Sequence, residues 1–197
     1  MESKNVKPDD AAIETALTRK KYGAADLAAL ALSTCGVGYI PIAPGTFGSA
    51  VGVVIYLIVA LIEANIGIYL STKGWRLEQI STLFFSANLV LLAAFCIAGI
   101  IASARTSKIL NNKDPQKVVV DEVMGQLVVF LFIPFGVHWV YVFAGFLLFR
   151  LFDIWKPYPI RAFEDIPNGI GVCADDLVAG VYGGICLSII YAVGYIW

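Results

Sequence analysis

The chain has 197 residues and a net charge of −1, and 59% of its residues are hydrophobic while only 15% are charged. Soluble domains are about 45–50% apolar and about 25% charged, so the excess apolar surface favours one compact domain embedded in a bilayer. The small net charge, with no basic patch interleaved with aromatic residues, excludes nucleic acid as a partner.

The N-terminal residues 1–25 are polar and contain no apolar signal-peptide core. We interpret them as a cytoplasmic leader that precedes a single helical membrane domain at 26–197. The four cysteines form no C-x-x-C pair, so buried, inert thiols are expected rather than zinc binding or disulfides.

Apolar segments predict the helices in chain order. Residues 26–40 are shorter than the roughly 20 residues of a crossing, which predicts an interfacial or partly inserted helix. A Pro/Gly-rich break, "PIAPGTFGS" at 41–49, comes before spans expected at 50–70 and 80–102. A polar, basic loop at 103–117 follows, and the last span is expected at 174–197.

The apolar stretch 118–152 is interrupted by "IPFGVHW", in which Pro134 and Gly136 are turn-forming residues. This pattern favours a re-entrant or short hairpin over one crossing. Basic residues concentrate in cytoplasmic loops, which places the leader and the 103–117 loop inside; the hairpin returns 150–175 to that side. The prediction is an all-α integral membrane helical bundle.

This topology gathers four polar islands at the cytoplasmic ends of the helices. They are "APGTFGS" at 43–49, "VVVDEVMGQ" at 118–126, "FRLFDIWKPYPIRAFED" at 149–165 and "GIGVCADDLVAG" at 169–180. Ionisable residues inside a membrane cost about 2.5–3.5 kcal/mol each on insertion scales. Such residues therefore indicate function unless a simpler structural role explains them.

The acidic residues differ in how well a structural role explains them. Asp121 and Glu122 stand together in an apolar run, which is a poor fit to mere charges at a helix entrance. Asp175 and Asp176 fit two roles equally: an N-cap of the last helix, or ligands after a Gly-rich bend.

The basic residues of the third island suit a phosphate site. Arg150, Asp153 and Lys156 are spaced by three, so they share one helix face while the helix lasts. Arg150 and Arg161 have the fork geometry that holds a phosphate. The alternative is a local ion pair with snorkelling basic side chains.

The first island contains Thr46 between Gly45 and Gly48, followed by Ser49. We interpret it as a loop feeding a helix N-terminus. Such a loop either binds an anion through its free backbone N–H groups or is capped by the hydroxyl of Thr46 or Ser49.

Together the islands offer carboxylates for a hard cation and basic groups for phosphate, which points to Mg²⁺-assisted phosphoryl chemistry. Other phosphatase chemistries are excluded, because no cysteine has an arginine six positions later and no Asp-x-Asp occurs. The only histidine, His138, falls at the hairpin tip on the far side. The nucleophile is then metal-activated water or a carboxylate.

These four islands, in this order and spacing, resemble the phosphatidylglycerophosphatase A family from about Gly36 to the C-terminus, above all in D-x-W-K-P-x-P-I-R and D-D-x-x-A-G. The resemblance implies a Mg²⁺-dependent hydrolase of the bacterial inner membrane that converts phosphatidylglycerophosphate to phosphatidylglycerol. It places these residues in the site: Thr46, Asp121, Glu122, Arg150, Asp153, Lys156, Arg161, Asp175 and Asp176.

We assign roles within this site as hypotheses, with residues 26–197 as the catalytic domain facing the cytoplasm. The catalytic group is Asp121, Glu122, Asp153, Lys156 and Asp176. The phosphate-binding group is Thr46, Gly48, Ser49, Arg150, Lys156 and Arg161. The metal ligands are Asp121, Glu122, Asp175 and Asp176.

Two other functions compete with this one. A small transporter or ion carrier would bind cations through intramembrane carboxylates, and Glu63 is the residue that fits it. A scaffold subunit of a lipid-synthesis complex would use the charges for topology alone. Metal count, acyl-chain selectivity and oligomeric state stay open.

Overall fold

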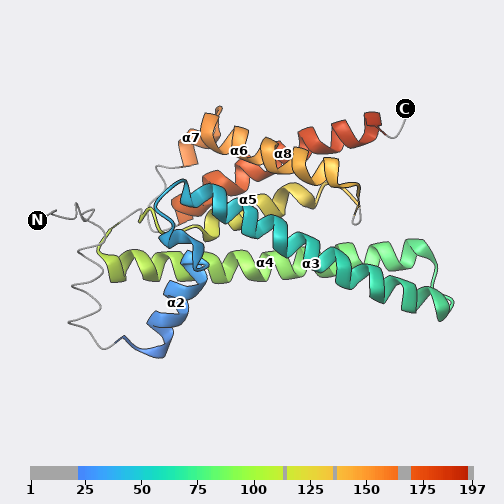
Figure 1. Ribbon diagram of the computed structural model, residues 1–197, viewed down its shortest axis with the longest axis horizontal. Helices are drawn as coiled ribbons and strands as arrows, with labels where there is room; N and C mark the ends of the chain where they lie inside the picture. The colour runs from blue at the N-terminus through green and yellow to red at the C-terminus, as the bar shows by residue number, and fades with distance from the viewer. Residues whose placement is uncertain (1–21, 113–114, 135–136, 164–169, 195–197) are drawn as a thin grey trace, which may run out of the picture.

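The structure is a computed structural model that describes residues 22–112, 115–134, 137–163 and 170–194. Within these ranges every regular element is helical, which confirms the all-α prediction (Figure 1). The elements are α2 (Ala24–Thr34), η1 (Val37–Tyr39), α3 (Pro44–Thr72), α4 (Leu77–Leu110), α5 (Val120–Phe130), α6 (Trp139–Trp155), α7 (Ile160–Phe163) and α8 (Ile170–Gly194).

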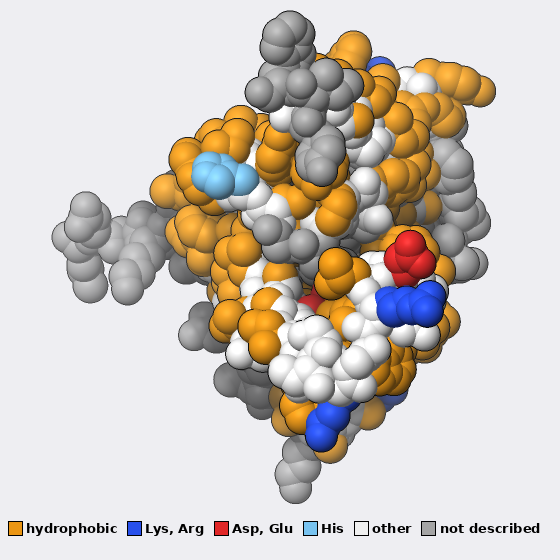
Figure 2. Space-filling view, turned by 90° about the vertical axis from the view of Figure 1, so that its right-hand side faces the viewer, with side chains coloured by type: hydrophobic (Ala, Val, Ile, Leu, Met, Phe, Trp, Pro, Cys, Tyr) orange, Lys and Arg blue, Asp and Glu red, His pale blue; other side chains and the backbone are white. Residues whose placement is uncertain are grey.

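Three of these helices are long and apolar enough to cross a membrane: α3, α4 and the part of α8 at Cys173–Gly194. Large apolar side chains such as Leu61, Val90 and Ile101 are exposed along α3 and α4, as lipid-facing residues should be. Figure 2, which looks at the end of the molecule that carries the α3–α4 turn, shows a mostly apolar face with few charged side chains. The membrane prediction is confirmed.

Helix α5 lies at the centre of the bundle, and nine of its eleven residues are buried. It packs against α3, α4, α6 and α8. Glycines permit the closest of these contacts: a Cβ on Gly180 would come within 2.4 Å of the Gly125 carbonyl oxygen. Small residues at helix interfaces let backbones approach in this way. As a result, the start of α5 lies beside the start of α8.

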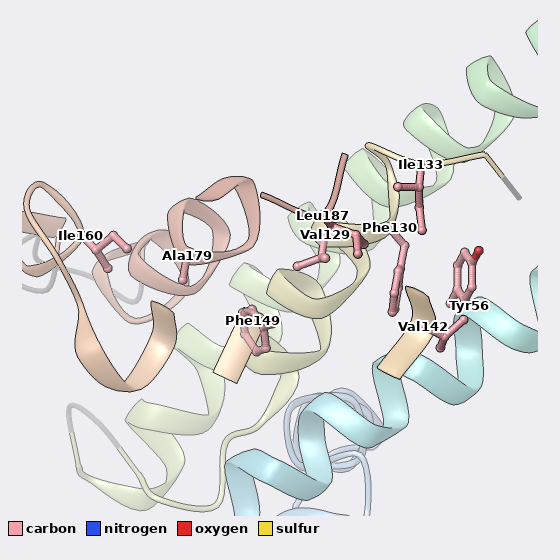
Figure 3. Packing of buried hydrophobic residues seen from close by; sticks show 9 residues of the cluster. All are labelled: Tyr56, Val129, Phe130, Ile133, Val142, Phe149, Ile160, Ala179 and Leu187. Atoms are coloured by element: carbon pink, nitrogen blue, oxygen red, sulfur yellow. The ribbon is translucent and has the colours of Figure 1, made fainter. Parts of the chain in front are cut away.

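The apolar core lies beyond this crossing, where α3, α5, α6 and α8 meet (Figure 3). Phe130 stacks on Tyr56 with ring centroids 4.2 Å apart, and Phe149 is fully buried close to Gly125. This packing holds one end of α5 in the apolar body. Its other end, with the acidic residues, is held where α6 ends and α8 begins.

The predicted hairpin at 118–152 is present as α5 and α6, joined through residues 131–138. The two arms differ in length, because α5 has 11 residues and α6 has 17. The apolar stretch before the turn, 118–133, predicts an arm of about 16 residues, but α5 takes only 11 of them. A helix enclosed by protein does not need the length of a crossing. His138 accepts a hydrogen bond from the Val140 N–H at the start of α6, so it lies at the far end of α6 from Arg150.

Three predicted boundaries are corrected. Helix α3 begins at Pro44, so most of the expected break at 41–49 is helical; proline suits a first helical turn because its missing N–H is not needed there. Helix α4 continues to Leu110, into the expected polar loop. Helix α8 begins at Ile170, so Asp175 and Asp176 lie inside it and the N-cap interpretation is wrong.

The expected interfacial helix at 26–40 is α2 followed by the short η1. The Ser33 and Thr106 hydroxyls are hydrogen-bonded at 2.8 Å, and the Ser33 backbone carbonyl accepts from the Val119 N–H at 2.8 Å. These contacts join α2 to α4 and to the start of α5. Most of the predicted leader, residues 1–21, lies outside the described residues.

Candidate active site

Three carboxylates form the centre of the site. Asp121 and Glu122 come from the first turn of α5 and Asp176 from α8, and one oxygen of each lies within 4.8 Å of the others. Asp121 and Asp176 are only 6% and 5% exposed. Two elements far apart in the sequence are brought together here by the α5–α8 crossing at Gly125 and Gly180.

The electrostatics of this cluster are unfavourable for three bare carboxylates. Burial raises the pKa of Asp121 well above its ordinary range, and the neighbouring Glu122 charge raises it further. Burial also raises the pKa of Glu122. The Glu122 Oε2 atom is buried and has no hydrogen-bond partner among the described residues. Such a cluster is balanced by protons or by a bound cation.

Arg150 is the basic group beside the cluster. Its Nη1 donates to Asp153 Oδ2 one turn further along α6, and lies 3.5 Å from the Ser49 hydroxyl of α3. Ser49 in turn donates to the Gly45 carbonyl at 2.9 Å. Arg150 and Asp153 share one helix face, as predicted, and they form the local ion pair that the sequence offered as the alternative to a phosphate contact. Ser49 reaches the same place from another helix.

Gly45 makes the contact between α3 and the acidic cluster possible. A Cβ at this position would come within 2.3 Å of Glu122 Oε1 and 3.3 Å of Arg150 Nη1. Any side chain here would displace a group of the site. The close approach brings the N-terminus of α3, a carboxylate of α5 and the guanidinium of α6 to one point.

Comparison with known proteins agrees with this geometry. The family model described as "Phosphatidylglycerophosphatase A" matches residues 30–191. The chain belongs to the phosphatidylglycerophosphatase A family. It is therefore an enzyme, a phosphatase, and the resemblance seen in the four islands is confirmed.

Individual relatives cover most of the chain. It is 32% identical over 163 residues to phosphatidylglycerophosphatase A of Escherichia coli (strain K12), covering 82% of this chain and 80% of the relative. It is 33% identical over 161 residues to the Haemophilus influenzae protein of that name, covering 81% and 84%. It is 37% identical over 155 residues to a putative phosphatidylinositol-3-phosphatase of Bacteroides thetaiotaomicron, covering 78% and 87%. No solved structure matches.

Lys156 and Asp175 form a second contact of this phosphatase, beside the three-carboxylate cluster. Lys156 is the C-cap of α6, so the helix ends just before Pro157 as a proline favours. Its φ of 46° is left-handed, which is uncommon for a residue other than glycine. Its ammonium donates to Asp175 Oδ2 at 2.6 Å. Asp175 is thus an ion-pair partner of Lys156, and the group of close carboxylates contains Asp176 without it.

Thr46 and Arg161, two of the predicted phosphate-binding residues, lie in environments that differ from the expected ones. The backbone N–H groups of Thr46 and Phe47 donate to the Ala43 carbonyl, so neither is left for an anion. Ala43 is the N-cap residue and offers no side-chain cap, so capping by Thr46 or Ser49 is wrong as well. Arg161 lies on the short helix α7 and is exposed, whereas the cluster is buried.

One residue of the site region escaped the sequence argument. Gln126, one turn after Glu122 on α5, is fully buried, and neither its Nε2 nor its Oε1 has a hydrogen-bond partner among the described residues. The available signal was a polar amide within the apolar run "VMGQLVVF". A neutral amide is a weaker sign of function than a charged side chain in an apolar segment, so the pattern pointed to the acidic residues first.

Proposed function

We propose that this phosphatase hydrolyses the terminal phosphomonoester of phosphatidylglycerophosphate, releasing inorganic phosphate and phosphatidylglycerol for phospholipid synthesis. The observation that carries the proposal is the buried cluster of Asp121, Glu122 and Asp176 with Arg150 beside it, at the end of three apolar helices. A phosphorylated head group can reach this cluster while the acyl chains stay in the bilayer. The names of the two phosphatidylglycerophosphatase A relatives support the same substrate.

The donor set supports Mg²⁺ as the cofactor. Hard oxygen ligands are what Mg²⁺ binds, through one or two carboxylates together with substrate phosphate oxygens. Asp121, Glu122 and Asp176 would hold it, and a divalent charge would offset the burial and the Glu122 charge that raise the pKa of Asp121. A bound Mg²⁺ supplies Lewis-acid polarisation of the phosphate and neutralises charge that develops on its oxygens.

The protein groups around the cation have complementary roles in this proposal. Arg150 neutralises charge on the phosphate oxygens in the transition state, and its ion pair with Asp153 orients the guanidinium. Glu122 Oε2, which has no described protein partner, accepts the proton of the attacking water. The water oxygen bonds to phosphorus, the ester P–O bond breaks, and the leaving glycerol oxygen takes up the proton that Glu122 received.

We further propose that the enzyme is an inner-membrane protein whose site faces the cytoplasm. Ser33 contacts both Thr106 of α4 and the start of α5, so the basic end of α4 lies at the same end as the site. Basic residues favour the cytoplasmic side.

A single cysteine at Asn111, in a variant without the native cysteines, should react with an impermeant maleimide only in inverted vesicles. Labelling in intact spheroplasts would reverse this orientation.

A second substrate is suggested by the Bacteroides relative, whose name is putative phosphatidylinositol-3-phosphatase. Phosphatidylinositol 3-phosphate also carries a phosphomonoester on a polyol, which a phosphodiester joins to diacylglycerol. The shared chemistry means that a cluster built for one head group admits the other unless groups next to the phosphate discriminate between them.

The experiment that tests the function uses purified protein in detergent micelles with each lipid. We expect phosphate release from phosphatidylglycerophosphate with Mg²⁺, loss of release with a chelator, and recovery when Mg²⁺ is added back in excess. If kcat/KM were greater for phosphatidylinositol 3-phosphate, that lipid would be the preferred substrate in place of phosphatidylglycerophosphate. Release that a chelator does not change would refute the metal, and no release from either lipid would refute the function.

A further inference from the structure

Helix α3 lies against α5 along a row of glycines. A Cβ on Gly48 would come within 2.9 Å of the Val119 Cβ, and a Cβ on Gly52 within 2.9 Å of the Gln126 Cβ. Gly45 meets Glu122 in the same row. Gln126 therefore lies in the α3–α5 seam that begins at the active site, next to a residue without a side chain.

Gln126 is in an environment that a glutamine should not tolerate without a ligand. It is 0% exposed, and both polar atoms of its amide lack a partner among the described residues. A buried donor or acceptor without a partner costs the free energy of its lost hydration. An apolar side chain of the same shape carries no such cost. Folding alone would favour leucine or methionine at this position, so the amide serves a group that is not part of the protein.

Other atoms without partners lie in the same region. Glu122 Oε2 and Arg150 Nε are also buried without a described hydrogen-bond partner, and the contacts of Gly45 show that these two side chains approach the same point of α3. Buried atoms of three side chains without described partners thus lie where α3, α5 and α6 meet, while Glu63 Oε2 and Ser103 Oγ lie elsewhere. This is the property of a site shaped around a polar ligand.

The position of Gln126 along α5 indicates which part of the ligand it would meet. It follows Glu122 by four residues, or about 6 Å along the helix axis, and it lies further from the α5 N-terminus. Beyond it α5 carries only apolar side chains, and Phe130 stacks on Tyr56. A lipid with its terminal phosphate at the carboxylates would continue in this direction toward its acyl chains.

We infer that Gln126 is a specificity-determining residue that binds the polar linker between the terminal phosphate and the diacylglycerol of the substrate. Its Nε2 donates to a non-bridging oxygen of the internal phosphodiester, and its Oε1 accepts from a hydroxyl of the linker polyol. The substrate reaches Gln126 by parting α3 from α5, whose contact at this level is a glycine against a side chain. The inference rests on the proposed function.

The test compares Gln126→Leu and Gln126→Met with the wild-type enzyme. Both replacements keep the approximate size of the side chain and remove its hydrogen bonds. We expect kcat/KM for phosphatidylglycerophosphate to fall about 10- to 100-fold, the effect of losing a hydrogen bond to a charged group. The inhibition constant of inorganic phosphate, which reports the terminal-phosphate site alone, should stay unchanged, and the melting temperature should be equal or higher.

Met124→Leu is the matched control, because Met124 is equally buried on α5 but packs against Gly99 of α4. It should leave kcat/KM within about twofold. The inference is overturned if both Gln126 variants keep wild-type kcat/KM, if phosphate inhibition weakens in parallel, or if both variants melt lower or do not fold. A wild-type enzyme inactive on the lipid would instead refute the proposed function itself.

Discussion

The enzyme buries carboxyl groups in two regions, and the groups around the carboxyls differ between the two. Glu63 of α3 is 8% exposed, and its Oε1 accepts a hydrogen bond from Asn88 of α4 at 2.6 Å. The three carboxylates near the start of α5 face one another instead. An acid with a neutral donor opposite forms a helix–helix contact, whereas acids that face each other are balanced by protons or by a cation.

This difference also bears on the transporter alternative, which depended on Glu63. Asn88 lines an apolar cavity of about 180 Å³ between α3, α4 and α5. The other residues around this cavity are all uncharged, so it holds no carboxylate. Glu63 is thus a single carboxylate bonded through Oε1 to Asn88, with its Oε2 lacking a partner among the described residues, whereas the three facing carboxylates lie at the site end of the bundle.

The largest effect should come from removing one charge from the cluster. Asp176→Asn and Glu122→Gln should each lower phosphate release at saturating Mg²⁺ by about 10³-fold or more, because the cation and the developing charge lose a ligand. Glu63→Gln is the matched control and should stay within about twofold. Released phosphate is measured with each variant at equal concentration of folded protein. Comparable losses in Glu63→Gln would abolish the distinction between the two regions.

Metal binding should also separate the regions without any turnover. A ligand that binds only the folded state at 100 times its Kd adds about 2.7 kcal/mol, which corresponds to roughly 5–11 °C in melting temperature for a chain of this size. Mg²⁺ should raise the melting temperature of the wild type and of Glu63→Gln, and much less that of Asp176→Asn. An equal rise in all three would show that Mg²⁺ binds elsewhere.

The sequence predicted most of this arrangement, because charge inside an apolar chain is rare and costly. Asp121 and Glu122 stood out for that reason, and the turn-forming Pro134 and Gly136 predicted the hairpin that turns α6 back toward them. The spacing of Arg150 and Asp153 predicted that they share one helix face, while their ion pair was the alternative to a phosphate contact.

What the sequence did not predict depends on which helices touch. Asp175 and Asp176 are neighbours, but only the crossing of α8 over Gly125 directs one to the cluster and the other to Lys156. The length of α5 was overestimated because its apolar residues face protein, and an apolar pattern does not distinguish protein from lipid as a neighbour. Helix α3 begins at Pro44, but the prolines and glycines around it are typical of a loop, which is what the sequence predicted.

The smallest effect should come from replacing Asn88, the neutral donor that is bonded to Glu63. Asn88→Leu removes the donor that Glu63 uses across α3 and α4, and interhelical hydrogen bonds of this kind contribute about 0.6 kcal/mol on average. We expect the melting temperature to fall by about 1–3 °C while kcat/KM stays within about twofold. The double variant Glu63→Leu/Asn88→Leu, which leaves no polar group unmet, should melt at or above the wild-type temperature. If Asn88→Leu lost tenfold in kcat/KM at normal stability, the Glu63–Asn88 pair would be coupled to the active site, and the two buried acidic regions would be parts of one system.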